Sequence, residues 1–106
     1  MKHVTYPLLS FTCDFNDLVA FEIEQKGFFD HAVITLEDGT RYKVHFYDPD
    51  RLAVDLKTEL KIGKACIAEP GLVIVPRVTL SDMQAAAKQL ANEGYFDSLK
   101  PIVPNA

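Results

Sequence analysis

The chain has 106 residues, of which 48% are hydrophobic and 25% charged, and its formal net charge is −4. This length suits one domain, and the composition is that of a folded globular protein rather than of a disordered one. The acidic balance disfavours nucleic acid as a partner, because duplex binding recruits several Lys or Arg side chains to phosphates. A membrane partner is not expected either, since no apolar stretch approaches the roughly 18 residues that a membrane span needs.

Two cysteines, Cys13 and Cys66, lie far apart in the sequence. A secreted domain of this size more often carries four or more cysteines in a disulfide framework. The first residues also lack the pattern of charged, apolar and small residues that a secretory leader has. These features predict one cytoplasmic domain over residues 1–106 with both thiols reduced. A single bridge between the two cysteines is the alternative.

The hydrophobic pattern changes at Leu18. Residues 1–17 show neither helical nor strand periodicity, so we expect an irregular segment or a short edge strand there. Residues 18–24 alternate between apolar and polar side chains, which predicts a strand with one buried face. Residues 32–36 are rich in β-branched side chains and predict the next strand.

Asp38-Gly39 predicts a hairpin, and the faces of its strands decide the loop length. A two-residue loop would pair Leu36 with Arg41 and place charges among large aliphatic side chains. A three-residue loop closed by Gly39 as a bulge pairs Leu36 with Thr40 and separates the faces, so we expect this register. One face then carries Ala32, Ile34, Leu36, Tyr42, Val44 and Phe46, and the other carries His31, Val33, Thr35, Arg41, Lys43 and His45.

Asp48-Pro49 predicts the start of a helix. The Asp48 side chain can accept hydrogen bonds from the free amides of the first turn, and Pro49 suits the first helical position. Gly63 is placed to end this helix. A narrow apolar stripe predicts that the helix lies on a surface: Leu52, Leu56 and Leu60.

The remaining sequence predicts a second hairpin and a last helix. Residues 65–68 and 72–75 have strand character, and Pro70-Gly71 between them suits a type II turn. The unbroken apolar run 72–75 indicates a strand that is covered on both faces or whose outer face meets a partner. A helix follows, capped by Thr79 or Ser81, and residues 97–106 form a surface tail. The apolar face of this helix consists of Met83, Ala86, Ala87, Leu90 and Ala91.

The expected element order is therefore βββ-α-ββ-α. An antiparallel sheet of about five strands with both helices on one face would bury every apolar stripe. The expected fold class is α+β, in the form of a two-layer sandwich.

The sharpest chemical hypothesis concerns His31 and His45, which lie opposite each other on the outer face in the bulged register. Two imidazoles about 5 Å apart at Cβ could share a divalent metal. Two solvated histidines are the simpler interpretation, because metal sites need three or four ligands. His3 is placed by no pattern, and Glu24 would be a third ligand only if its strand approached the same face. No cofactor is predicted.

Other catalytic patterns are missing from the sequence. Asp48, Asp50 and Asp55 are explained as a cap, as a partner of the helix dipole and as a solvated side chain. No serine has a Gly-x-Ser-x-Gly context, and no polar cluster indicates a small-molecule pocket between helix and sheet. The sequence thus favours a non-enzymatic protein. The alternative is a small metal- or acid-base-dependent enzyme that uses His31 and His45.

The strands carry more apolar surface than one small domain needs. We therefore predict an interface through Val33, Thr35, Val73 and Val75, used by a homodimer or by another protein. The function expected from the sequence is that of a cytoplasmic protein–protein interaction module.

Overall fold

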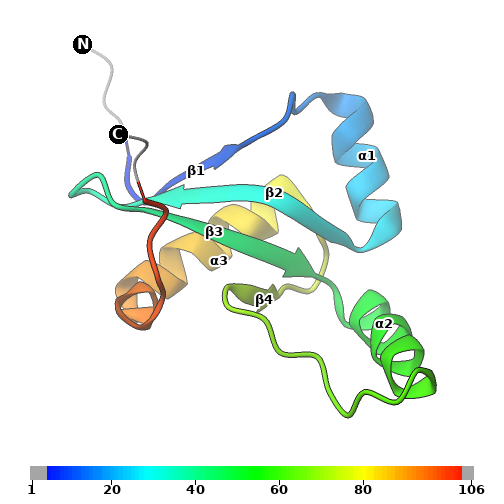
Figure 1. The fold of residues 1–106 in the computed structure, drawn as a ribbon. Helices are drawn as coiled ribbons and strands as arrows, with labels where there is room; N and C mark the ends of the chain where they lie inside the picture. The colour runs from blue at the N-terminus through cyan, green and yellow to red at the C-terminus, as the bar shows by residue number, and fades with distance from the viewer. Residues whose placement is uncertain (1–4, 104–106) are drawn as a thin grey trace.

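The structure is a computed structural model that describes residues 5–103, in which a mixed four-stranded sheet is combined with three α-helices and one short 3₁₀ helix (Figure 1). The strands are β1 (Leu8–Phe11), β2 (Phe28–Thr35), β3 (Arg41–Tyr47) and β4 (Leu72–Ile74). The helices are α1 (Asp17–Lys26), α2 (Pro49–Lys61), α3 (Leu80–Asn92) and the 3₁₀ helix η1 (Tyr95–Ser98). The predicted α+β class is confirmed, whereas the predicted element order is wrong. No helix among the described residues is long and apolar enough to cross a membrane.

The sheet has the strand order β1-β2-β3-β4. β2 pairs antiparallel with both β1 and β3, and β4 pairs parallel with β3. The expected antiparallel sheet of about five strands is therefore wrong. Residues 65–68 form no strand but belong to the connection that returns the chain to β3, and a crossover of this kind is what parallel pairing requires.

Residues 18–24 lie in α1, so the strand predicted there is also wrong. The Asn16 side chain accepts a hydrogen bond from the Val19 N–H at 2.9 Å, and Gly27 ends the helix with φ 77°. Val19 and Ile23 are four residues apart and share a helical face; Ile23 is buried, while Phe21 between them is 63% exposed. The caps at both ends therefore outweigh the short alternation of apolar residues.

The bulged hairpin between β2 and β3 is confirmed. Gly39 has φ 88°, and the Leu36 N–H donates to the Thr40 carbonyl at 2.9 Å. The strands pair in the expected register, with Ala32 opposite Val44 and Ile34 opposite Tyr42. At the sheet edge, β1 confirms the expected short edge strand within the first 17 residues.

The core lies between the sheet and α3, which crosses one face of the sheet (Figure 1). Thr79 caps α3 by accepting a hydrogen bond from the Asp82 N–H at 3.2 Å, and this decides between the two caps expected. The largest fully buried side chains are Phe46, Phe96, Ile34, Met83, Val44 and Val78.

The predicted start of α2 is confirmed, because the Asp48 side chain accepts from the Arg51 N–H at 2.7 Å and Pro49 opens the helix. The helix does not cover the sheet, however. It extends beyond the end of β3, away from α3, and none of its 13 residues is buried (Figure 1). The expectation of two helices on one face is therefore wrong for α2.

The described part of the tail runs past the start of β3, where the Ile102 N–H donates to the Arg41 carbonyl at 2.8 Å. Residues 97 and 98, expected in this tail, belong to η1. Residues 1–4 and 104–106 of the two expected end segments lie outside the described part of the chain.

Candidate functional site

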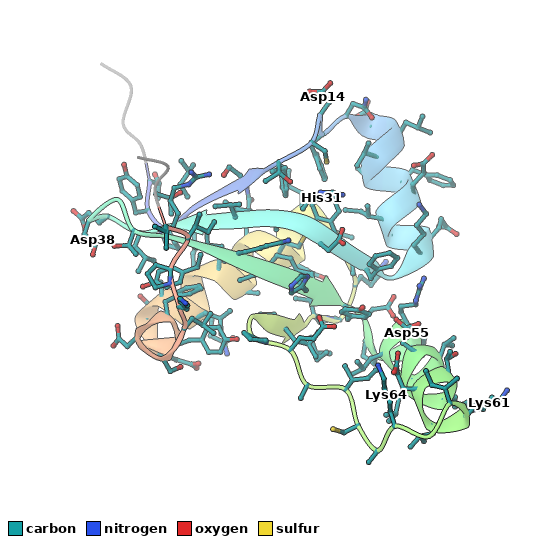
Figure 2. All side chains as sticks on the ribbon, in the orientation of Figure 1. Asp14, His31, Asp38, Asp55, Lys61 and Lys64 are labelled. Atoms are coloured by element: carbon teal, nitrogen blue, oxygen red, sulfur yellow. The ribbon has the colours of Figure 1, made fainter. Side chains whose placement is uncertain are left out.

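His31 and His45 lie on adjacent strands, but their rings have separate surroundings. His31 Nδ1 lies 3.1 Å from Thr12 Oγ1, and its Nε2 lies 3.5 Å from Asp30 Oδ1 (Figure 2). The pairing of β2 with β3 shifts between Phe29 and Ala32, which displaces His31 from the regular register. His45 instead lines a pocket together with residues 99–102 of the described tail.

The third ligands considered for these histidines are not brought to them. Glu24 lies on α1, with its carboxylate 3.7 Å from Arg77 Nη1, and His3 lies outside the described residues. Within residues 5–103 no group of three or more His, Cys, Asp and Glu side chains could hold a metal ion. A metal site on His31 and His45 stays a prediction.

The four residues of the predicted interface lie on two faces of the sheet. Val73 and Val75 belong to the core and are 9% and 3% exposed. Val33 and Thr35 point to the opposite face, where Val33 is buried and Thr35 half-buried. The interface through these four residues stays a prediction, and more accessible apolar side chains lie elsewhere.

Three leucines follow one ridge of α2, which we call the leucine stripe: Leu52, Leu56 and Leu60. Leu56 is 36% exposed, Leu60 is 52% exposed, and Leu52 is half-buried. The spacing of four residues places them on one side of the helix. Val54 is 59% exposed but stands about 160° around the helix from Leu56, so it does not belong to the stripe.

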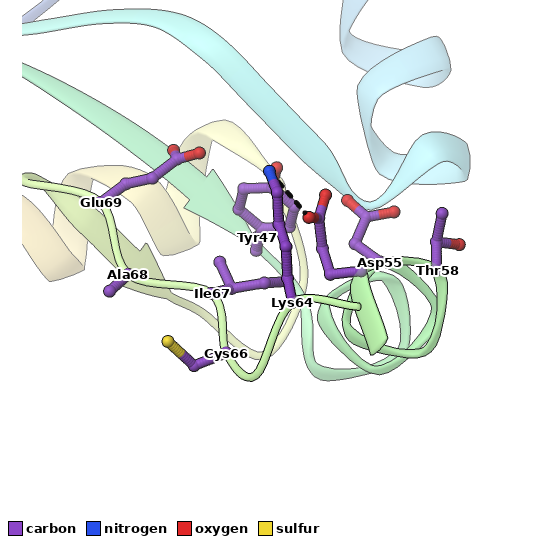
Figure 3. Close-up of a pocket in the computed structure, with 9 residues that line it drawn as sticks. Tyr47, Asp55, Thr58, Lys64, Cys66, Ile67, Ala68 and Glu69 are labelled. Atoms are coloured by element: carbon purple, nitrogen blue, oxygen red, sulfur yellow. Dashed lines mark ion pairs between the residues drawn. The ribbon is translucent and has the colours of Figure 1, made fainter. Parts of the chain in front are cut away.

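The side of α2 that faces the rest of the chain is polar. Asp55 and Glu59 line a cleft of about 360 Å³ between α2 and the segment 64–69 (Figure 3). The Arg51 Nε–H donates to Asp55 Oδ1 at 2.9 Å, and Lys64 Nζ lies 3.2 Å from Glu59 Oε2. Ion pairs therefore occupy the inward side of the helix, while the leucine stripe stays accessible.

Arg51 also connects the start of α2 to the sheet. Its guanidinium lies 4.4 Å from the centre of the Phe28 ring, and its Nη1 donates to the Lys26 carbonyl at 3.2 Å. The other end of α2 carries Lys61 and lies far from the sheet (Figure 2). These contacts join the first turn of the helix to the segment where α1 ends and β2 begins.

Tyr47 lines the cleft at the end of β3. Burial, followed by the negative charges of Asp55 and Glu69, raises the pKa of its hydroxyl. The phenol is protonated at neutral pH even at its ordinary pKa, and the raised pKa extends this to more alkaline solution, so Tyr47 can donate a hydrogen bond. The cleft therefore holds a protonated tyrosine among carboxylates.

We expect the substitution Asp55→Asn to lower the pKa of Tyr47 toward the ordinary value near 10, because one of the charges that oppose its ionisation is removed. A raised folded-state pKa contributes stability that is present below the unfolded pKa and is lost as the pH rises through the folded value. Ultraviolet titration of the tyrosines, with Tyr47→Phe to identify the signal, measures the shift.

Asp50→Asn is the matched control for this titration, because it removes a carboxylate from the same helix that is not among the charges acting on Tyr47. An unchanged midpoint in Asp55→Asn would contradict the geometry of the cleft.

The sequence identified the leucine stripe but not the cleft. Tyr47, Asp55 and Glu69 meet only because β3, α2 and the following loop fold back on one another, and no local pattern links them. The glutamate–lysine pair across the end of α2 likewise joins the helix to the loop.

The fold and this surface define an α+β protein that carries an amphipathic helix with an exposed leucine stripe beside its sheet. No protein-family model matches the chain, and the searches of curated proteins and of solved structures also found no match.

Proposed function

We propose that the protein is a non-enzymatic interaction module that buries the leucine stripe of α2 against another protein chain. The observation that carries this proposal is that α2 is amphipathic and yet contains no buried residue. An isolated helix of about 12–15 residues is marginal in water, and helices in proteins gain most of their stability by packing an apolar face. A protein surface that covers the stripe would supply this packing.

A second copy of the chain is the partner that we expect. Ridges spaced by four residues pack into the corresponding grooves of an identical helix, and a twofold contact uses the same patch on both chains. The stripe is short, since a helix of 13 residues is about 20 Å long. It offers much less than the roughly 800 Å² per partner of a standard interface, so we expect a dimer that forms with rising concentration.

We also propose a cytoplasmic location. Cys13 and Cys66 are both free and exposed, which suits a reducing compartment.

The double substitution Leu56→Glu/Leu60→Glu should weaken self-association by at least about tenfold, because it places charges in the surface to be buried. Light scattering at increasing protein concentration measures the mass of each variant, and circular dichroism checks that each is folded. Val54→Glu is the control for an added glutamate, since it places one at an exposed apolar position on the other side of α2. The wild type and this control should both reach the dimer mass.

Native mass spectrometry of the protein purified from its own host completes this test. A wild type that stays monomeric and retains no protein partner would contradict the interaction function. The wild type could instead retain a different protein that the stripe variant does not bind. This result would support the interaction function and identify that protein, rather than a second copy, as the partner. Binding to lipid vesicles through the same leucines, without a protein partner, would overturn the proposal.

A further inference from the structure

A second accessible surface lies at the free edge of the sheet, where β4 is the last strand. A groove of about 270 Å³ runs between this edge and α3. Its walls are mostly apolar and come from three elements: Leu72 and Ile74 of β4, Ala86 and Leu90 of α3, and Tyr95 of η1.

The parallel ladder determines which backbone groups of β4 face this groove. The His45 N–H donates to the Gly71 carbonyl at 2.8 Å, and the Val75 N–H donates to the Tyr47 carbonyl at 2.9 Å. In a parallel pair, alternate residues make the bonds to the neighbouring strand, so the odd-numbered residues of this segment face β3. The N–H and C=O of Ile74 therefore point away from β3, to the open side of the sheet.

β4 is a short edge strand with Pro70 and Pro76 close to its two ends, but the strand itself carries no charge. Residues 72–75 include neither a charged residue nor a proline, and Ile74 is 45% exposed. Natural edge strands are commonly shielded by charges, prolines or bulges. An uncharged edge beside an apolar groove is instead the arrangement that recognises an extended peptide.

We propose that β4 and its groove bind an extended segment of another polypeptide, which pairs with Ile74 as a fifth strand and places an apolar side chain against α3. The unpaired backbone groups of Ile74 define the occupant as a β-strand, and the lining of the groove defines its side chains as apolar. Since a three-residue strand offers an edge of only about 10 Å, the occupant is a short extended segment and not a whole domain docked edge to edge. This surface is separate from α2, so the inference does not rest on the function proposed above.

The substitution Ile74→Pro tests the backbone pairing. Proline removes the outward N–H, and the ladder to β3 keeps its bonds because it does not use that group. Ile74→Thr is the matched control, since it loses the same apolar side chain but retains the N–H. The probe is a phage-displayed library of random linear peptides selected on the immobilised wild-type protein, and the enriched sequences are then synthesised for titration.

We expect the enriched peptides to alternate apolar and polar residues. Ile74→Pro should weaken their binding by about tenfold or more, and Ile74→Thr by only about threefold, because only the proline variant leaves a peptide carbonyl without its donor. The amide NMR signals of Ile74, Ala86 and Leu90 should shift when peptide is added to the wild type, a measurement that does not depend on the folding of a variant. Leu56→Glu/Leu60→Glu should bind the same peptides as the wild type.

The absence of any enriched peptide would overturn this proposal. Equal binding by the proline and threonine variants, or peptide shifts confined to residues outside β4 and α3, would overturn it as well.

Discussion

We expect the substitution Phe46→Ala to lower the free energy of unfolding by about 3–5 kcal/mol, the usual range for a buried phenylalanine. Phe46 is 0% exposed and pairs with Phe29 on β2 and Val73 on β4, so its ring fills the core where three strands meet. A cavity there weakens the packing of the sheet against α3. For a domain of this size, each kcal/mol lowers Tm by about 4–8 °C, which calorimetry resolves readily.

Phe21→Ala is the control for this substitution. It removes the same ring from α1, where the side chain is 63% exposed, and we expect a change of about 0.5 kcal/mol or less. Similar losses in the two variants would contradict the position of β3 at the centre of the core.

The elements that the sequence predicted correctly are those whose signals are local. In the hairpin, the Asp38 side chain accepts from the Thr40 N–H at 2.9 Å, and Gly39 supplies the positive φ that the bulge needs. The start of α2 is similar, because the Asp48 cap and Pro49 lie within one turn of each other. In both cases the residues that specify the geometry are close neighbours in the chain.

The errors concern segments whose structure is decided elsewhere in the molecule. Residues 18–24 form only two turns of helix, and over that length strand alternation and helical spacing both accommodate Val19 and Ile23. The direction of β4 depends on its approach to β3 through Gly71, and the turn sequence around Pro70 does not encode this contact. Short segments of this kind are determined by tertiary packing more than by their own pattern.

The sequence shows which leucines form the stripe on α2, but it does not show that their side chains are accessible to solvent. The spacing of the leucines on α2 is visible in the sequence, whereas their accessibility depends on contacts that Arg51 makes with Lys26 and that Glu59 makes with Lys64. These two contacts hold the polar side of the helix toward the cleft. The predicted interface residues Val73 and Val75 are in the core because the pairing of β4 with β3 directs them there.

The substitution Gly71→Ala should lower the free energy of unfolding by about 2–5 kcal/mol. Gly71 has φ 79°, a conformation that costs other residues roughly 1–2 kcal/mol. A Cβ atom added there would lie 2.6 Å from the Lys43 carbonyl oxygen, which is backbone and cannot rotate away. Relief of this clash requires β4 to move away from β3, and overpacking of this kind adds about 1–3 kcal/mol. Chemical denaturation measures the loss, and amide exchange of Val73 and Val75 should become faster.

Gly39→Ala separates the two contributions. Gly39 has φ 88°, similar to that of Gly71, but no atom lies within 4 Å of the Cβ position, so only the conformational cost of about 1–2 kcal/mol applies. The excess loss in Gly71→Ala therefore measures the close approach of β4 to β3. Equal losses in the two variants would contradict that approach, and they would also undermine the peptide groove, because its outward N–H at Ile74 depends on the parallel ladder that starts at Gly71.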